Sequence, residues 1–472
     1  MTRPEQVLPG PVMAAVDIGA SSGRVMAAGL VDDRIDLVEV HRFDNGPVAR
    51  EGHLYWDIEM LITEVITGLR RVVERWPEVI SIGVDTWAVD YGLLDASGEL
   101  IGRPYAYRDP RTEAVIDTVH AAISPERLYA ITGLQHLPFN TVYQLTAEQA
   151  GPRWPIAARL ALLPDLIVHR LTGRLVAEVT NASTTGLLDA TSRRWSNEVL
   201  DAVGVPGDLL PELAEPGTTV GTVRPGLGLP PIPVVAVGSH DTASAVVGVP
   251  AADDHFGYVS SGTWSLVGVE LPGPVLTEQS RAANFTNEGG VDRTVRLLRN
   301  VGGLWLLEQC REAWGDRAPA LGDLLAAAGE LPAGGPLVDV DATDLITPGR
   351  MPERIADACR RTGQPAPAGP VAITRCILDS LADAYARTLD RAAELSGRPI
   401  SSVHVVGGGA RNELLCRLTA RATGREVLAG PVEATAFGNV LVQARTAGLA
   451  PDTLPALRRL LADSVQLTRH LP

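Results

Sequence analysis

Short apolar segments alternate with amphipathic helical patterns along this chain, and this alternation limits the folds that it can adopt. Between Asp57 and Trp76, apolar residues recur at positions i, i+3, i+4 and i+7, which predicts a helix with one buried face. Asp57 is suited to cap that helix because its carboxylate can accept free backbone N–H groups. The apolar segment Val79–Val84 follows at once and predicts a short buried strand.

The same alternation returns near the C-terminus. The patterns predict, in order, a helix at Ile373–Leu395, a strand at Val403–Val406, a helix at Glu413–Ala422, a strand at Glu426–Leu428 and a helix at Ala434–Thr446. Gly397 is placed to end the first of these helices. Strands that alternate with helices indicate an α/β fold with a mainly parallel sheet.

Two segments, Val16–Gly23 and Tyr258–Leu266, each join a strand to a turn of glycine, serine or threonine and then to further apolar residues. Each predicts a hairpin, and together they form a weak internal repeat. A chain of 472 residues is long enough for two or three domains of about 150 residues each. We expect two domains, residues 1–249 and 250–472, divided at the step from Val249 to Pro250.

The charge of the chain argues against two classes of partner. Basic residues number 41 and acidic residues 56, for a net charge of −15, and every basic residue is arginine. An acidic chain repels nucleic-acid backbones and anionic membranes, so neither partner is expected. The absence of lysine excludes a Walker A phosphate loop and a lysine Schiff base.

Targeting and metal-binding signals are also missing from the sequence. No stretch approaches the roughly 18 apolar residues of a membrane-spanning helix, and we expect a cytoplasmic protein. The four cysteines form no CxxC pair and the histidines form no HExxH motif, so a thiolate or imidazole metal site is not expected. The sequence defines no oligomeric state and is compatible with a monomer.

Two aspartates, Asp17 and Asp241, occupy positions at which a carboxylate can bind a metal ion or accept a proton. Asp17 ends an apolar strand beside a Gly/Ser turn, where it can hold Mg²⁺ near a bound phosphate or simply accept turn amides. Asp241 follows His240 between a strand and a helix, where it can take a proton from a hydroxyl. The alternative is that Asp241 or Ser239 only caps the helix.

Three further segments have both a functional and a structural reading. Gly407–Gly409 can lay a nucleotide against bare backbone or form only a tight turn. Asp85–Asp90 places Trp87 and two carboxylates beyond a strand, a set suited to sugars, although tryptophan is more often part of a core. Asn300 can bind a ligand or cap the helix that follows.

Taken in order, many segments of the chain carry a shared set of motifs. These are Asp17–Met26, His41–Phe43, Asp85–Trp87, Tyr107–Asp109, Arg111–Thr112, Pro138–Thr141, Tyr143–Leu145, Arg170–Gly173, Thr180–Ala182, Ser239–Ala245, Ser260–Leu266, Asn287–Gly290, Gly407–Gly409 and Ala429–Ala434. In these motifs the chain resembles the FGGY carbohydrate kinases over nearly its whole length. The resemblance implies two ribonuclease H-like domains of the actin/hexokinase type that flank an active-site cleft, with sugar mainly on the first domain and ATP mainly on the second.

The resemblance also implies an activity and the residues that perform it. The activity is transfer of the ATP γ-phosphoryl group to the 1-hydroxyl of L-rhamnulose, with Mg²⁺ as cofactor and Asp241 as the catalytic base. The implied sugar contacts are Ala88, His240, Asp241, Thr242 and Asn300. The implied ATP contacts are Ala20, Ser21, Ser22, Gly23, Arg24, Thr263, Glu308 and Gly408, and Asp17 is implied on the Mg²⁺ side.

The chain departs from the family pattern in two places. Ala88 stands where the family usually has glycine, and its methyl group narrows the expected sugar pocket. Glu308 stands where a relative has glutamine. The resemblance leaves open whether Cys359 and Cys376 form a disulfide.

Two alternative functions stay open at this point. One is a kinase of the same family for another ketose, such as L-fuculose or a pentulose. The other is an actin-like, nucleotide-dependent sensor without sugar kinase activity.

Overall fold

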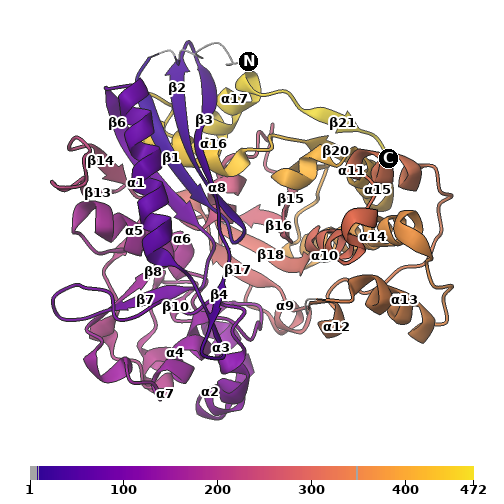
Figure 1. Cartoon of the computed structure of the whole chain (residues 1–472), viewed down its shortest axis with the longest axis horizontal. Coiled ribbons are helices and arrows are strands. Elements are labelled where there is room, and N and C mark those ends of the chain that lie inside the picture. The colour runs from indigo at the N-terminus through magenta and orange to yellow at the C-terminus, as the bar shows by residue number, and fades with distance from the viewer. Residues whose placement is uncertain (1–7, 9, 347–348) are drawn as a thin grey trace. The chain divides into compact units, whose positions relative to one another are not determined.

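The chain folds into two compact units, each built around its own sheet. A computed structural model describes residue 8 and residues 10–346 and 349–472. The first unit comprises the chain up to Ala252 together with Glu270–Leu297 and Ala434–Ser464, and the second comprises Asp253–Val269, Leu298–Glu433 and Val465–Pro472 (Figure 1). The step from Val249 to Pro250 lies close to the first of these boundaries, but the chain returns to the first unit twice.

The central sheet of the first unit has the order β13-β14-β6-β1-β2-β3. Its strands are β1 (Val12–Ile18), β2 (Ser22–Val31), β3 (Arg34–Asp44), β6 (Val79–Thr86), β13 (Thr219–Thr222) and β14 (Pro233–Val235). Strands β1, β2 and β3 pair antiparallel, whereas β6 runs parallel to β1 and β14 runs parallel to β6.

The second unit repeats this arrangement. Its sheet runs in the order β17-β18-β16-β15-β19-β20-β21, with β15 (Phe256–Ser261), β16 (Trp264–Leu271), β17 (Thr286–Gly289), β18 (Val295–Gly302), β19 (Ser402–Val406), β20 (Glu426–Ala429) and β21 (Thr468–His470). Strand β15 pairs antiparallel with β16 and parallel with β19, which in turn runs parallel to β20. Both predicted hairpins, β1–β2 and β15–β16, are therefore confirmed, as is an α/β fold with two related units.

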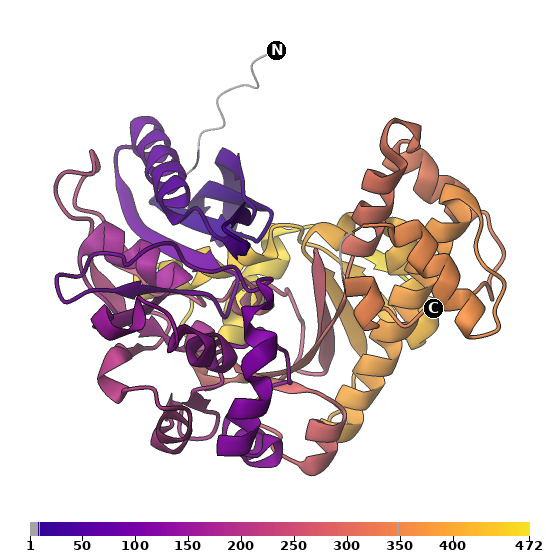
Figure 2. The ribbon, with the colours of Figure 1, turned by 60° about the horizontal axis from the view of Figure 1, so that its bottom comes forward.

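Helices cover these sheets, and those predicted over 57–76, 373–395, 413–422 and 434–446 are present. Those of the first unit are α1 (Ile58–Arg75), α2 (Ile116–Ala122), α3 (Pro125–Thr132), α4 (Thr141–Glu148), α5 (Leu163–Thr172), α6 (Val179–Ala182), α7 (Asn197–Val203), α8 (Asp241–Val247), α9 (Glu278–Ala282), α16 (Ala434–Thr446) and α17 (Leu454–Ser464). Those of the second are α10 (Trp305–Trp314), α11 (Leu321–Gly329), α12 (Thr343–Ile346), α13 (Met351–Arg361), α14 (Gly369–Ser396) and α15 (Glu413–Thr423). Helix α1 packs against β2 and β3 (Figure 2), and Asp57 caps it by accepting a hydrogen bond from the Met60 N–H.

Short strands outside the two central sheets complete the first unit. They are β4 (Val48–Arg50), β5 (His53–Tyr55), β7 (Tyr91–Leu94), β8 (Arg159–Leu162), β9 (Ala177–Glu178), β10 (Leu188–Asp189), β11 (Arg194–Trp195) and β12 (Leu213–Ala214). Several of them form two-stranded pairs such as β4–β5 and β7–β8. None of the helices that the structure describes is both long and apolar enough to cross a membrane.

Helix α16 belongs to the first unit because two glycines let its backbone approach α8. A Cβ on Gly438 would lie 1.8 Å from the Ser244 carbonyl oxygen, and one on Gly248 would lie 2.1 Å from that of Ala434. At this distance Gln443 donates hydrogen bonds to the Ala14 carbonyl and to Asn439. The helix from the C-terminal part of the chain thus closes the core over β1 and β6.

The burial of Asp165 predicts a pH dependence of the free energy of unfolding. Its buried carboxylate on α5 accepts the Glu178 N–H, and burial raises its pKa well above the usual value, with the Glu178 charge adding to the rise. The unfolded chain ionises this group near pH 3.9. Since the folded state resists ionisation, the group costs folding free energy as the pH rises above that value.

We therefore expect Asp165→Asn to gain stability relative to the wild type as the pH rises from about 4 to 7, because the amide keeps an acceptor but never ionises. Urea denaturation at several pH values measures the difference. Asp201→Asn, at an exposed position on α7, serves as the control and should show no such trend. If the difference in free energy of unfolding between Asp165→Asn and the wild type stays constant from about pH 4 to 7, the raised pKa of Asp165 is contradicted.

Candidate active site

Asp241 begins helix α8 directly after His240. Its carboxylate oxygen Oδ1 accepts hydrogen bonds from the Thr242 N–H at 2.6 Å and from the Thr242 hydroxyl at 3.2 Å. The side chain is 31% exposed, so it is fixed in direction and still reachable. The residue at the N-cap is His240, and it makes no side-chain capping bond. Ser239 does not cap the helix, since its hydroxyl donates to Glu178 instead. Asp241 is not the N-cap residue, but its carboxylate accepts one free N–H of the first turn, that of Thr242.

The surroundings of Asp241 make its carboxylate a stronger base than a free aspartate. Desolvation raises its pKa, and the negative charge of Asp17 adds to the rise, whereas His240 and the hydrogen bonds from Thr242 oppose it. A raised pKa favours acceptance of a proton from a substrate hydroxyl.

His240 is held between carboxylates and an arginine. Its Nε2 lies 3.4 Å from Asp241 Oδ1, and its Nδ1 lies 3.3 Å from Glu288 Oε2. The buried guanidinium of Arg296 lies 3.1 Å from the same Glu288 oxygen. Burial alone would raise the pKa of Glu288, but Arg296 and His240 outweigh it and lower that pKa. Glu288 thus stays charged and fixes the ring of His240 beside Asp241.

The buried carboxylate of Glu178 holds the turn that carries His240 and Asp241. Its Oε2 accepts the Ser239 N–H at 2.9 Å and the Ser239 hydroxyl at 2.7 Å. The same side chain accepts the N–H and the hydroxyl of Thr180. The Thr180 hydroxyl oxygen in turn accepts the His240 N–H at 3.3 Å. One carboxylate therefore joins α6 to the turn before α8.

Asp17 and Arg24 face each other across the β1–β2 hairpin. They are register partners, and Arg24 Nη2 donates to Asp17 Oδ2 at 2.7 Å. The turn that contains Ala20, Ser21 and Ser22 is exposed or half-buried, and the Asn45 N–H donates to the Ser21 carbonyl at 3.1 Å. Gly23 is required because a Cβ there would lie 2.2 Å from the Phe43 ring. The tip of the hairpin is thus open to solvent, and its base packs against Phe43.

Asp17 offers a single carboxylate to a Mg²⁺ ion, and its Oδ2 is already paired with Arg24. Mg²⁺ is usually held by one or two carboxylates together with substrate phosphates. Asp17 is a nearly buried oxygen donor on the same hairpin as the exposed turn. In the ranges that the structure describes, no cluster of three histidine, cysteine or acidic side chains is arranged for a metal, so Asp17 would hold the ion only with help from a nucleotide.

A buried carboxylate supports the loop that contains Ala88. Asp90 Oδ2 accepts the indole N–H groups of Trp56 at 2.6 Å and Trp87 at 2.9 Å, and Gln144 donates to Oδ1 at 3.0 Å. Burial raises the pKa of Asp90 to about 6, and these hydrogen bonds oppose the rise. Asp90 is thus occupied by the protein and is not a free sugar ligand.

The loop around Ala88 is strained and lined by aromatic rings. Val89 has a φ of 67°, a conformation that is an outlier for a β-branched residue. The rings of Trp56 and Trp87 lie 4.3 Å apart between centroids, and Ala88 itself is half-buried. Backbone strain of this kind is typical of functional sites.

Asp85 was predicted to lie beyond the end of a strand, and this prediction is wrong. It lies inside β6, fully buried, and its Oδ2 accepts a hydrogen bond from Asn439 at 2.6 Å. Burial raises its pKa well above the usual value, and the charge of Asp17 adds to the rise. Asp85 is therefore part of the polar interior under α16.

In the second unit, the β15–β16 hairpin and the glycine turn pack tightly together. Thr263 lies in the hairpin turn, and its carbonyl accepts the Trp305 N–H at 3.3 Å. Gly407 has a φ of 79°, and a Cβ there would lie 2.9 Å from the Ser261 carbonyl oxygen. A Cβ on Gly409 would lie 2.0 Å from Ser261 Oγ, whereas one on Gly408 would meet no atom within 4 Å. Gly408 alone therefore presents open backbone.

The remaining predicted residues of the second unit lie on neighbouring elements. Asn300 is half-buried on strand β18 and Glu308 is exposed in the first turn of α10. The alternative that Asn300 caps the following helix is wrong, because the helix begins at Trp305 with Leu304 at its N-cap. Cys359 Sγ and Cys376 Sγ lie 3.9 Å apart, and both thiols are free and buried.

Comparison with known proteins identifies relatives along the whole chain. Residues 12–248 match the N-terminal domain of the FGGY family of carbohydrate kinases, and residues 257–447 match the C-terminal domain. A rhamnulokinase of Bacteroides thetaiotaomicron is 43% identical, over 97% of this chain and 95% of its own length. A rhamnulokinase of Pectobacterium carotovorum subsp. carotovorum is 44% identical, over 98% of this chain and 93% of its own length.

Solved structures share the fold at lower sequence identity. A gluconate kinase from Lactobacillus acidophilus superposes with a TM-score of 0.81 at 15% identity, over 98% of this chain and 94% of its own. A Plasmodium falciparum glycerol kinase with ADP gives a TM-score of 0.78 at 15% identity, over 99% of this chain and 95% of its own. The expected fold of two actin/hexokinase-type units is therefore confirmed.

The glycine turn provides a matched pair of substitutions. We expect Gly409→Ala to lower the free energy of unfolding by about 1–3 kcal/mol, because its methyl group would overlap the buried Ser261 side chain. Gly408→Ala is the control, since its methyl group enters open space. Thermal unfolding followed by circular dichroism measures both, and an equal Tm for the two variants would contradict the packing described.

Proposed function

Because the chain belongs to the FGGY family of carbohydrate kinases, we propose that it is an ATP-dependent kinase that phosphorylates L-rhamnulose at its 1-hydroxyl to give L-rhamnulose 1-phosphate. The observation that carries the proposal is the identity of 43–44% with relatives named rhamnulokinase over 97–98% of this chain. The location in the cytoplasm and the lack of nucleic-acid and membrane partners stay predictions from the sequence.

In this proposal Asp241 orients the attacking hydroxyl and accepts its proton. The fixed direction of the carboxylate, set by Thr242 and His240, and its raised pKa support that role. His240 and Thr242 would contact the sugar together with Asn300, and the methyl group of Ala88 would lie against it. Phosphoryl transfer depends mainly on such positioning and on charge neutralisation.

We assign the phosphate contacts to arginine, backbone amides and hydroxyl groups, since the chain has no lysine. In the first unit these are Ala20 to Arg24, and in the second they are Thr263 and Gly408, with Glu308 as a nucleotide contact. Asp17 would hold Mg²⁺, which when bound neutralises charge on the phosphates. We assign sugar binding mainly to residues 1–249 and ATP binding mainly to residues 250–472.

The role of Asp241 has a direct test. We expect Asp241→Asn to lose about 10²- to 10⁴-fold in kcat, the range usual for a general base, while ATP still binds. Since the Asp241 pKa is raised, wild-type kcat/KM should fall with decreasing pH at values above the ordinary aspartate pKa of about 3.9. ADP release measured by a coupled assay gives both quantities, with the exposed Asp208→Asn as control. Near-normal turnover of Asp241→Asn would remove the residue from this role.

The identity of the sugar is tested by a panel of ketoses. We expect L-rhamnulose to give the highest kcat/KM, above L-fuculose and the pentuloses. Ala88→Gly should reduce the discrimination between these ketoses by roughly 10-fold or more, the usual effect of one methyl group in a pocket. If another ketose gives a higher kcat/KM, that ketose replaces L-rhamnulose as the proposed substrate, and the proposed kinase activity stands. ATP binding without turnover of any ketose would favour the sensor instead.

A further inference from the structure

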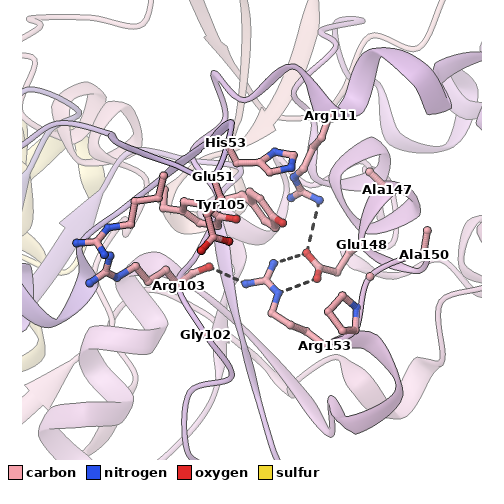
Figure 3. A pocket seen from close by; sticks show the side chains of 14 residues that line it. Glu51, His53, Gly102, Arg103, Tyr105, Arg111, Ala147, Glu148, Ala150 and Arg153 are labelled. Atoms are coloured by element: carbon pink, nitrogen blue, oxygen red, sulfur yellow. Dashed lines mark hydrogen bonds and ion pairs between the residues drawn. The ribbon is translucent and has the colours of Figure 1, made fainter.

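A cavity of about 690 Å³ in the first unit is lined by none of the residues assigned above. Figure 3 shows it from close by. The β4–β5 hairpin, the loop at Arg103 and Tyr105, and the end of α4 with the loop that follows it provide its walls. Four of its lining residues are arginines, namely Arg50, Arg103, Arg111 and Arg153. Four guanidinium groups thus surround one cavity, although the chain has a net charge of −15.

The acidic residues of the cavity do not balance these arginines. Only Glu51 and Glu148 line it as carboxylates. Glu148 is almost fully buried and pairs with Arg153 through Nε at 2.9 Å, and it also lies 3.5 Å from Arg111 Nη1. His53 also lines the cavity, and its Nδ1 lies 3.1 Å from Asp109 Oδ2.

Two of the arginines have no acidic partner of their own. Across the part of the chain that the structure describes, no carboxylate lies within ion-pair distance of the side chains of Arg50 or Arg103, although the Arg103 carbonyl accepts a hydrogen bond from Arg153 Nη1 at 2.6 Å. The cavity therefore carries an excess of two positive charges and unused N–H donors.

Aromatic rings hold the paired arginines in place. The guanidinium carbons of Arg111 and Arg153 lie 4.0 Å and 4.6 Å from the centroid of the Tyr105 ring, and Tyr55 stacks on Tyr105 at 4.6 Å. Cation–π contacts and the bidentate pair with Glu148 fix these side chains before any ligand arrives. Arg111 and Arg153 are thus preorganised, and this part of the site loses less entropy on binding.

We propose that this cavity binds a small phosphomonoester dianion, separately from the catalytic site. A dianion matches the excess charge, and phosphate oxygens accept the forked N–H groups of arginine. A phosphate monoester carries nearly two charges at neutral pH because its second pKa is about 6. The volume has room for a sugar as well as the phosphate.

The test uses the full chain with its nucleotide site filled by a non-hydrolysable ATP analogue and Mg²⁺. Isothermal titration calorimetry at low salt then measures binding of inorganic phosphate in one arm and of L-rhamnulose 1-phosphate in the other. We expect saturable binding that weakens at least about ten-fold in the double variant Arg50→Ala/Arg103→Ala, since each charge-assisted hydrogen bond is strong. Binding in the first arm as well as the second identifies phosphate itself as the recognised group, and binding in the second alone identifies its sugar ester.

The matched control is Arg34→Ala/Arg194→Ala, which removes two exposed arginines that do not line the cavity and should leave binding unchanged. Both double variants should keep the wild-type kcat and the KM values for ATP and sugar. Absence of saturable binding in both arms, or equal binding by the wild type and Arg50→Ala/Arg103→Ala, would overturn the proposal. A lower molar mass of that variant in light scattering, without loss of ligand binding, would instead identify the cavity as a contact between copies of the chain.

Discussion

The buried carboxylate of Glu178 is the interaction on which the geometry of the proposed catalytic site most depends. It accepts hydrogen bonds from α6 and from Ser239, directly before His240 and Asp241. A buried charge is costly unless such donors surround it, and here they are backbone N–H and hydroxyl groups whose own positions become fixed in return. The turn that carries Asp241 is therefore held in place by a fully buried side chain.

Local patterns were sufficient to predict much of the fold and the position of Asp241. Helix periodicity and a capping carboxylate located α1 through Asp57, and a left-handed glycine ended α14 at Gly397. Both hairpins could be predicted because strand, turn and strand are neighbours in the sequence. Asp241 could be placed at a strand-to-helix junction for the same reason, and the set of motifs in order pointed to the family.

Contacts between distant residues could not be predicted in this way. Glu178 lies 61 residues before Ser239, and Arg296 lies 56 residues after His240. No local sequence pattern around Glu178 or Arg296 predicts these contacts. Asp90 was expected to be available to a sugar, but two indoles and Gln144 occupy it. An isolated polar residue reveals its role only when the fold brings its donors to it, since burial must be matched by hydrogen bonds.

The return of α16 and α17 to the first unit has a consequence for how the chain matures during synthesis. Gln443 and Asn439 supply hydrogen bonds to the interior beneath β1 and β6, and Gly438 lets α16 lie directly on α8. A ribosome therefore releases the strands of the first unit long before the helix that covers them. Domains otherwise tend to fold from the N-terminus as they emerge, but here the early strands must wait, with apolar surface uncovered, until almost the entire polypeptide has been made.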